Sequence, residues 1–416
     1  MASDWPTGLL ADLCDSVDYG FTASATTEPV GPKFLRITDI RQQGLDWGSV
    51  PHVEIDDSKL DRYRLHHGDI VVARTGAFTG ANAYLAAPVG AVFASYLVRL
   101  KSGPRLHSRY AYYFMQSNWY ADHVAGVIGG SAQPNASAKA LTRVLMPVPP
   151  LDEQRRIAAI LGALDDKIEF NRKMNRTLEE MAQAIFKSWF IDFDGHCSAP
   201  ADMVDSELGP IPRGWVIKPL PEIIDINPRT TLKVGITATF VEMADLPTSG
   251  CSVTSSIKKD VAGGGAKFRL GDTLLARITP CLENGKTALV DFLDEGEVGF
   301  GSTEFIVLRP KADFHAAWTY CLARSLEFRQ HAISNMTGSS GRQRVPTDCF
   351  TNFAMPEPDV DTLRRFGAVA GPAFDRIKAN ADQSRTLAAL RDALLPKLIS
   401  GEIRVPEAEA AVEEAA

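Results

Sequence analysis

The chain repeats itself, and this repeat limits what it can fold into more than any other feature of the sequence. Trp5 and Trp215 stand 210 residues apart, and each leads an apolar run. In the middle of each half, residues 67–75 match residues 270–278, and both segments carry Gly-Asp, an apolar run and then Ala-Arg. Matching positions are 203 residues apart there and close to 210 residues apart at the ends. The halves therefore share the same order of segments but differ in loop length. Self-similarity at this scale predicts two copies of one folded module.

Two further segments extend the repeat and indicate the fold class. Residues 92–101 align with residues 302–311, and a loop rich in Gly, Ser and Gln recurs at 129–135 and 339–344. The short runs of β-branched and apolar residues predict strands, and aromatic runs near residues 110–115 and 317–322 predict buried helices. We therefore expect an α/β fold of the mixed α+β kind, with two pseudo-symmetric domains.

Each half closes with a long helical pattern whose apolar positions recur in steps of four and three. Such heptad spacing is typical of a coiled-coil seam, so two matched seams predict a pair of long antiparallel helices that form a rod. The predicted seam residues are Ile157, Leu161, Leu164, Ile168, Asn171, Leu178 and Ile185 in the first helix and Ile377, Asn380, Leu387, Leu394 and Leu398 in the second.

Polar residues interrupt both seams at equivalent places. Asn171 and Asn380 could pair across the seam and fix its register, or they could face solvent where the helices diverge. Pro372 predicts that the second helix starts or kinks at that position. The expected organisation is a globular half at 1–150, a helix at 151–195, a second globular half at 196–357, a second helix at 358–404 and a disordered acidic tail at 405–416.

The sequence lacks the motifs of several enzyme and binding classes. The formal net charge is −7, so there is no basic footprint over the whole chain. The six cysteines form no Cys-x-x-Cys pair, which argues against a zinc site, and no phosphate-binding loop or nucleophile elbow occurs. Asn227-Pro228-Arg229 begins like a base-methylation motif but lacks its second proline and its aromatic residue. We therefore assign no catalytic and no metal-binding residues.

Membrane and export signals are also missing from the sequence. No stretch of about 18 apolar residues occurs, and the first residues have no apolar core preceded by positive charge. We expect a cytoplasmic protein with reduced cysteines. Two modules held apart by a helical rod favour a protein that reads a two-part ligand, and DNA, with half-sites at fixed spacings, is such a ligand.

Several segments are typical of one known family: residues 149–158, which open the first helix with Pro-Pro-Leu-Asp-Glu-Gln, Gly68-Asp69 and Gly271-Asp272, and residues 212–215 and 395–403. In these segments the sequence resembles the specificity subunit of a type I restriction–modification enzyme. The resemblance extends over nearly the whole chain. The second helix begins with Glu357-Pro358-Asp359 and departs from the pattern because it lacks the Glu-Gln pair.

This resemblance implies a subunit that performs no chemistry itself. Residues 1–150 and 196–357 would be two target-recognition domains, each reading one half of a bipartite site in double-stranded DNA, while the helix pair sets the gap. Two methylation subunits would bring S-adenosylmethionine, and two motor–nuclease subunits would use ATP and Mg. No cofactor is expected on this chain. A coiled-coil scaffold for another partner, or a stand-alone DNA methyltransferase or nuclease, remains the alternative.

Polar residues on the repeated loops are the expected DNA contacts, because such side chains bind phosphates and base edges. The predicted set is Gln133 and Asn135, supported by Arg74, Thr75 and Ser131, in the first half, and Arg342, Gln343 and Arg344, supported by Arg277, Ser339 and Ser340, in the second. The loops could instead be ordinary solvated loops. Arg74 and Arg277 could instead form buried pairs with the nearby aspartates.

Overall fold

The computed structural model describes residues 5–40, 45–87, 90–128, 135–194, 202–311, 314–339 and 341–415. The chain divides into two compact units. Unit 1 consists of Met1–Glu169 together with Ser384–Ala416, and unit 2 is Phe170–Gln383. The divisions between the units therefore fall inside both long helices, so each unit contains a part of each helix.

Unit 1 is built on a four-stranded antiparallel sheet with the strand order β2-β7-β4-β5. These strands are Cys14–Tyr19, Leu97–Ser102, Ile70–Ala73 and Asn82–Tyr84, respectively. Helix α2 (Ser108–Met115) packs on β5 and β7. Alternation along the strands sends Ile70 and Val72 toward the cluster that contains Tyr110, whereas Val71 and Ala73 enter a second core on the other face.

Smaller elements complete unit 1. Strands β3 (Lys33–Leu35) and β6 (Ala91–Phe93) form a parallel pair. Strand β1 (Thr7–Leu9) pairs antiparallel with β8 (Leu145–Pro147), which directly precedes the first long helix. The short helices of this unit are α1 (Asp57–Tyr63), α3 (Asn118–Ile128) and α4 (Ala138–Thr142).

Unit 2 repeats this plan with the strand order β12-β19-β16-β17. These strands are Ile224–Ile226, Phe305–Pro310, Thr273–Ala276 and Thr287–Leu289. Helix α7 (Ala316–Arg324) packs on β16, β17 and β19, and α8 (Leu326–Ser334) follows it, as α3 follows α2. Strands β11 (Val216–Pro219) and β20 (Ala354–Glu357) correspond to β1 and β8. The repeated sequence therefore folds into a repeated topology.

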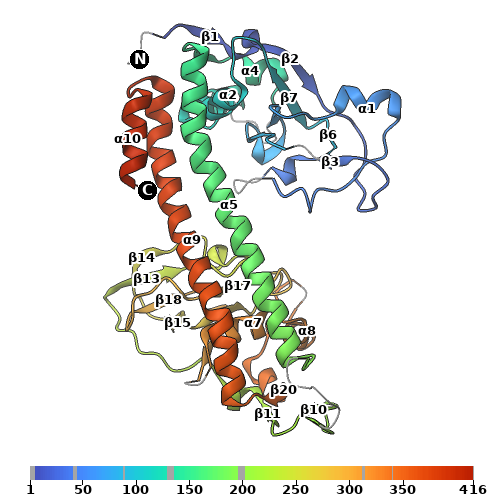
Figure 1. The fold of residues 1–416 in the computed structure, drawn as a ribbon, viewed down its shortest axis with the longest axis vertical. Helices are drawn as coiled ribbons and strands as arrows, with labels where there is room; N and C mark the ends of the chain where they lie inside the picture. Colours follow the sequence, from blue (N-terminus) through green and yellow to red (C-terminus); the bar gives the residue numbers. More distant parts are fainter. Residues whose placement is uncertain are drawn as a thin grey trace. The chain divides into compact units, whose positions relative to one another are not determined.

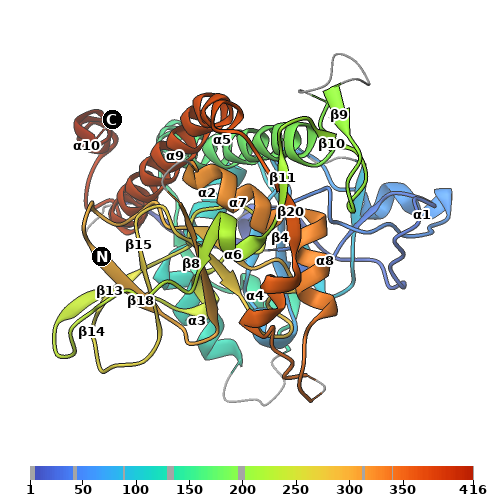
Figure 2. The same cartoon turned by 90° about the horizontal axis from the view of Figure 1, so that it is seen from below.

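The second sheet of unit 2 is larger than its counterpart in unit 1. Strands β13 (Thr237–Val241) and β18 (Val298–Gly301) form the parallel pair, and β14 (Ile257–Asp260) and β15 (Ala266–Arg269) flank it. Figure 2 shows these four strands together at one side of the unit. The remaining elements are β9 (Met203–Val204), β10 (Ile211–Pro212) and α6 (Leu220–Ile223).

Strand pairing corrects one alignment within the repeat. Leu97 lies opposite Ala73 in unit 1, and Phe305 lies opposite Ala276 in unit 2. Leu97 and Phe305 are thus equivalent, so the offset of this segment is 208 rather than the 210 implied by aligning 92–101 with 302–311. A slip of two residues keeps every side chain on the same face of a strand, so the apolar pattern fits both alignments.

The two long helices are α5 (Leu151–Phe190) and α9 (Val360–Ser400). They lie side by side within each unit (Figure 1). Of the two alternatives for Pro372, a helix start there is wrong, because α9 begins at Val360 and continues through the proline, as the expected helix at 358–404 does. Ala370 and Phe374 on either side of Pro372 are buried in the core of unit 2, and this burial outweighs the missing backbone hydrogen bond.

In unit 1 the helix pair is apolar. Five of its predicted seam residues lie in one buried cluster, Ile157, Leu161, Leu164, Leu394 and Leu398. Ile168 is also buried, and Leu387 is half-buried beside the cluster. Arg391 of α9 donates to Asp165 of α5 over 2.6 Å, and the same carboxylate accepts from the hydroxyl of Tyr113 over 2.7 Å. This network joins both long helices to α2.

In unit 2 the helix pair contains a polar layer. The amide of Asn171 donates to the carbonyl oxygen of Asn380 over 3.3 Å and to Gln383 over 2.9 Å, and Asn380 donates to Asn175 over 2.8 Å. Asn171 and Asn380 are only 1% and 2% exposed, so they do not face solvent. Ile377 is buried in the apolar core of the unit, and Leu178 and Ile185 pack against that core.

The C-terminal segment corrects another expectation. The tail predicted to be disordered forms helix α10 (Val405–Ala415) in unit 1. Val405 and Ala408 are buried in the main cluster of the unit, and Ala411 and Val412 pack against it. Apolar residues at these spacings make one helical face, which the concentration of acidic residues had obscured. Arg404 just before the helix lies 4.9 Å above the ring of Trp5.

Gln154, from the motif that opens the first long helix, joins that helix to the loop between β7 and α2. Its side chain is fully buried. It accepts from the backbone N–H of His107 over 2.8 Å and donates to the carbonyl oxygens of Arg105 and Pro149 over 3.1 and 2.8 Å. The equivalent position in the second helix is the apolar Leu363, so this polar clamp belongs to unit 1.

Gln154→Ala should therefore destabilise unit 1. The substitution leaves a buried donor and two buried acceptors without hydrogen-bond partners, which should lower the free energy of unfolding by about 2–3 kcal/mol. This corresponds to a decrease in Tm of roughly 5–10 °C. Thermal unfolding followed by calorimetry measures the change. Gln183→Ala is the matched control, because the Nε2 atom of Gln183 makes no hydrogen bond within the described residues. Equal Tm values for wild type and Gln154→Ala would contradict the clamp.

Candidate nucleic-acid interface

In unit 1 the fold brings the end of strand β4 against the end of the repeated loop. Thr75 and Asn135 form an isolated antiparallel bridge, and the N–H of Ala136 donates to the carbonyl oxygen of Arg74 over 2.8 Å. The Arg74 guanidinium donates to the side-chain oxygen of Asn135 over 3.0 Å and to the carbonyl oxygen of Ala136 over 3.2 Å. It also lies 5.0 Å above the ring of Tyr19. Arg74, Thr75 and Asn135 therefore form one cluster.

Unit 2 builds the same arrangement with different side chains. Ile278 and Arg344 form the bridge, and the N–H of Val345 donates to the carbonyl oxygen of Arg277 over 2.9 Å. The position of Asn135 is thus taken by Arg344. The Arg344 Nε and Nη2 atoms donate to Glu304, at 2.9 and 2.7 Å from its Oε1 atom.

The charges in the unit 2 cluster are unequally compensated. The hydrogen bond and the positive charge of Arg344 lower the pKa of the Glu304 carboxyl, with a further contribution from the charge of Arg277. Arg344 and Glu304 neutralise each other. The Nε atom of Arg277 is buried and has no hydrogen-bond partner within the described residues. The cluster therefore retains one positive charge, on an arginine without a carboxylate bonded to it.

The remaining predicted contacts are placed as follows. Ser131, Gln133 and Ser340 lie outside the described residues. Ser339 and Arg342 are exposed, and the N–H of Arg342 donates to the carbonyl oxygen of Ser339 over 3.0 Å. Gln343 is half-buried, and its carbonyl oxygen accepts from Thr279.

The alternative in which Arg74 and Arg277 pair with the nearby aspartates is wrong. Asp272 is buried and accepts two hydrogen bonds of 2.7 Å from Arg309 on the neighbouring strand β19. Asp69 accepts from the backbone N–H of His66 over 2.9 Å. Both aspartates thus stabilise the fold through other partners, and neither Arg74 nor Arg277 pairs with them.

Sequence reasoning missed Tyr19 and Glu304, the partners of the two clusters. The N–H of Arg74 donates to the carbonyl oxygen of Tyr96, and the N–H of Arg277 donates to that of Glu304, so Tyr96 and Glu304 are equivalent. Strand pairing alone makes this equivalence visible. Tyr19 and Tyr96 are 46% and 58% exposed, which adds aromatic surface to unit 1 only.

No metal or membrane-spanning feature is found in the part of the chain that the structure describes. No group of three His, Cys, Asp or Glu side chains there could hold a metal ion. The five described cysteines are free. No described helix is both long and apolar enough to cross a membrane.

Comparisons with known proteins agree with this fold. A sequence profile of the type I restriction modification DNA specificity domain matches residues 2–180. The solved structure of a type I restriction–modification S subunit from M. genitalium covers 95% of this chain and 96% of its own, with a TM-score of 0.57 at 15% sequence identity. At that identity the likeness concerns the fold alone. The class defined here is thus a two-domain protein with a long helix pair.

Curated relatives extend this similarity to most of the chain. The specificity subunit of the type I restriction enzyme MjaIX from Methanocaldococcus jannaschii is 28% identical over 72% of this chain and 70% of its own length. That of EcoAI from Escherichia coli is 34% identical over 37% of this chain, which spans only 27% of the EcoAI subunit. These relatives are type I restriction–modification specificity subunits, and residues 2–180 of this chain match the DNA specificity domain of that family.

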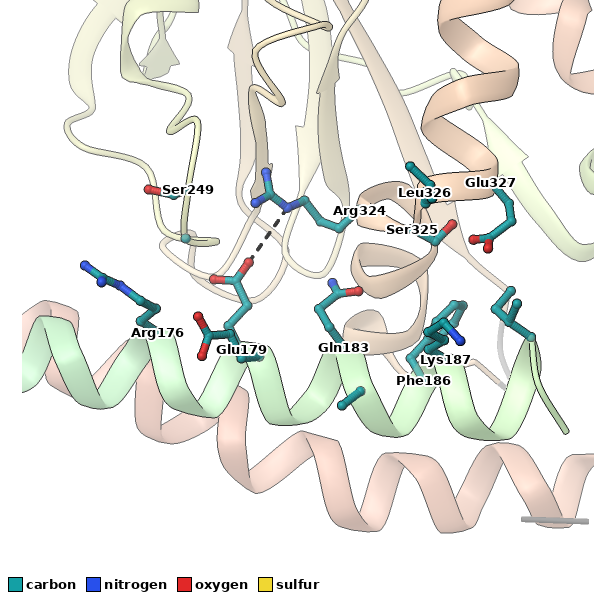
Figure 3. Close-up of a pocket in the computed structure, with 14 residues that line it drawn as sticks. Arg176, Glu179, Gln183, Phe186, Lys187, Ser249, Arg324, Ser325, Leu326 and Glu327 are labelled. Atoms are coloured by element: carbon teal, nitrogen blue, oxygen red, sulfur yellow. Dashed lines mark ion pairs between the residues drawn. The ribbon is translucent and has the colours of Figure 1, made fainter. Parts of the chain in front are cut away.

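A cavity in unit 2, apart from the residue clusters described above, has the buried carboxyl of Glu179 on its wall. It measures about 520 Å³ and lies between α5, the loop at Ser249 and the turn from α7 to α8 (Figure 3). Glu179 on its wall is 7% exposed, and its carboxylate accepts from the buried hydroxyl of Tyr320 over 2.6 Å. Arg324 lies 3.8 Å from the same oxygen. These contacts tie α5 to α7 and give Glu179 a structural role.

Burial raises the pKa of the Glu179 carboxyl, although Tyr320 and Arg324 oppose the shift. The folded state therefore holds this proton more tightly than the unfolded chain does. Its contribution to stability is full below about pH 4.3, the unfolded value, and is lost as pH rises to the folded value. Glu179→Gln, which still accepts from Tyr320, should remove that loss.

The Tm difference between Glu179→Gln and wild type should accordingly increase as pH rises from about 4.3. Thermal unfolding across pH 4 to 8 measures it. Glu180→Gln, an exposed neighbour on the same helix, is the control and should run parallel to wild type. Parallel curves for Glu179→Gln as well would show that burial does not perturb this carboxyl.

Proposed function

We propose that this chain is a specificity subunit that reads a bipartite site in double-stranded DNA, one half with each unit. The observation that carries the proposal is the equivalent position of the two clusters, Arg74 with Asn135 and Arg277 with Arg344. Both combine a guanidinium with a partly exposed side chain that can donate to base edges. Guanidinium groups bind phosphates and guanine, and amides suit adenine.

The acidic net charge is compatible with this function. Four glutamates, Glu407, Glu409, Glu413 and Glu414, lie on α10, whereas both clusters carry net positive charge. Long-range steering depends on the local field near the contact surface rather than on the total charge. Partner subunits that clamp the duplex would add the remaining phosphate contacts.

The long helices would set the unspecified gap between the half-sites, and the Asn171–Asn380 layer would fix their register. Type I specificity subunits assemble with other restriction–modification subunits and DNA. We propose two methylation subunits that carry S-adenosylmethionine and two motor–nuclease subunits that use ATP and Mg, with no cofactor on this chain. Such an assembly would work on the host DNA in the cytoplasm.

Methylation mapping of host DNA by long-read sequencing tests the proposal directly. The comparison is between cells with and without this gene, in the presence of its methylation subunit. A two-part motif that disappears with the gene supports the proposal. Methylation that is unchanged in cells with a proven active partner would instead favour a scaffold, and methylation by the chain alone would favour a stand-alone enzyme.

The role of the helix pair yields a separate prediction. Four residues inserted into α5 near Asn171, with four more in α9 near Asn380, add about 6 Å to the pair. The gap in the methylated motif should grow by about one or two base pairs, at ~3.4 Å each. Insertion into one helix only is the control and should disrupt the pairing. An unchanged gap in an assembled, active complex would refute this role.

A further inference from the structure

We propose that Arg344 recognises a guanine in the half-site bound by unit 2, and that Glu304 is the residue that positions its guanidinium. This inference rests on the proposed DNA-reading function and assigns part of the specificity to one residue pair. Three features support it: the rigid backbone of Arg344, the free edge of its guanidinium and the charge of its pair with Glu304.

The backbone of Arg344 is held on two sides. Its N–H donates to the carbonyl oxygen of Thr337 over 2.8 Å, and the N–H of Thr337 donates back over 2.9 Å. On the other side Arg344 forms the bridge with Ile278, and the neighbouring Gln343 accepts from Thr279. A residue in the middle of three paired segments presents its side chain from a fixed position, which base recognition requires.

Glu304 occupies one defined edge of the guanidinium. Its carboxylate accepts from Nε and Nη2, which lie on the same side of the group. Among the described residues, the other edge, formed by Nη1 and the second hydrogen of Nη2, makes only a long contact of 3.5 Å with the carbonyl oxygen of Arg342. The side chain is 44% exposed. This free edge has the two parallel donors that fit O6 and N7 of guanine.

The charge of the pair favours a base over a phosphate. A carboxylate bonded to the guanidinium cancels its charge and would repel a phosphate, but it leaves the hydrogen-bond donors on the free edge in place. A carboxylate oxygen can also accept from N4 of cytosine, so both residues are compatible with one G·C pair. Arg277 beside them, whose Nε atom has no hydrogen-bond partner among the described residues, is the better phosphate contact.

The equivalent position in unit 1 supports a role in specificity. Asn135 stands there, and its side-chain oxygen accepts from Arg74, whereas Arg344 donates to a carboxylate. The frame is the same, but the hydrogen-bonding groups presented differ between the halves. A position that holds a different polar residue on a shared frame is suited to distinguish one half-site from the other.

The experiment uses the complex of this chain with its methylation subunit and the motif found for wild type. Binding is measured at fixed salt to the intact site and to duplexes in which each G·C pair is replaced in turn by A·T. Arg344→Lys keeps the positive charge but loses the two parallel donors of the guanidinium. It should lose roughly 5- to 150-fold discrimination at one G·C pair of one half-site, with unchanged affinity for non-specific DNA.

Two further variants separate positioning from folding. Glu304→Gln keeps the size and one acceptor, so it should reduce discrimination at the same base pair by a smaller factor. Arg364→Lys, at a side chain on α9 of the same unit that is 73% exposed, is the matched control and should leave every base preference as in wild type. Tm values equal to wild type establish that each variant is folded.

The outcomes distinguish this inference from the function on which it rests. A wild-type complex with no sequence preference overturns both. A wild-type preference that Arg344→Lys leaves intact at every position overturns the assignment of Arg344 alone. An equal loss of affinity on all sequences makes Arg344 a phosphate contact and also overturns the assignment. A Glu304→Gln variant that retains full discrimination overturns the positioning role.

Discussion

The main core of each unit is completed by both long helices, and the rest of the structure depends on this shared burial. In unit 1, Ile157 of α5 and Leu398 of α9 lie in the same cluster as residues of the recognition sheet. In unit 2, Phe186 and Phe366 do the same. At about 25 cal/mol per Å² of buried apolar surface, such side chains contribute a large share of a unit's stability. Each long helix is therefore part of the core of both units.

The sequence predicted the features that depend on periodicity and self-similarity. The two long helices and the repeated module followed from heptad spacing and from matched segments, because these patterns extend over many residues. The sequence did not predict features that are set by single tertiary contacts. Glu304 is an isolated acidic residue in a turn, and nothing nearby in the sequence indicates that it will meet Arg344, 40 residues later.

The errors have equally specific causes. Composition suggested a disordered tail because its charges are conspicuous, but the apolar spacing of Val405 and Ala408 decided the outcome. Pro372 suggested a break, but buried neighbours kept α9 helical. The two-residue slip between equivalent strands preserves the alternation of faces, so strand pairing was needed to resolve it. Local propensity failed where burial opposed it.

The division of the chain into units has a consequence for biosynthesis. Unit 2 is a continuous segment, Phe170–Gln383, whereas unit 1 joins the beginning of the chain to residues that follow Ser384. During translation from the N-terminus, unit 2 has all of its sequence before unit 1 does. The sheet of unit 1 is therefore synthesised well before α9 and α10, and the apolar face that these helices cover stays exposed until they have been made. The unit encoded first is the last that can complete its core.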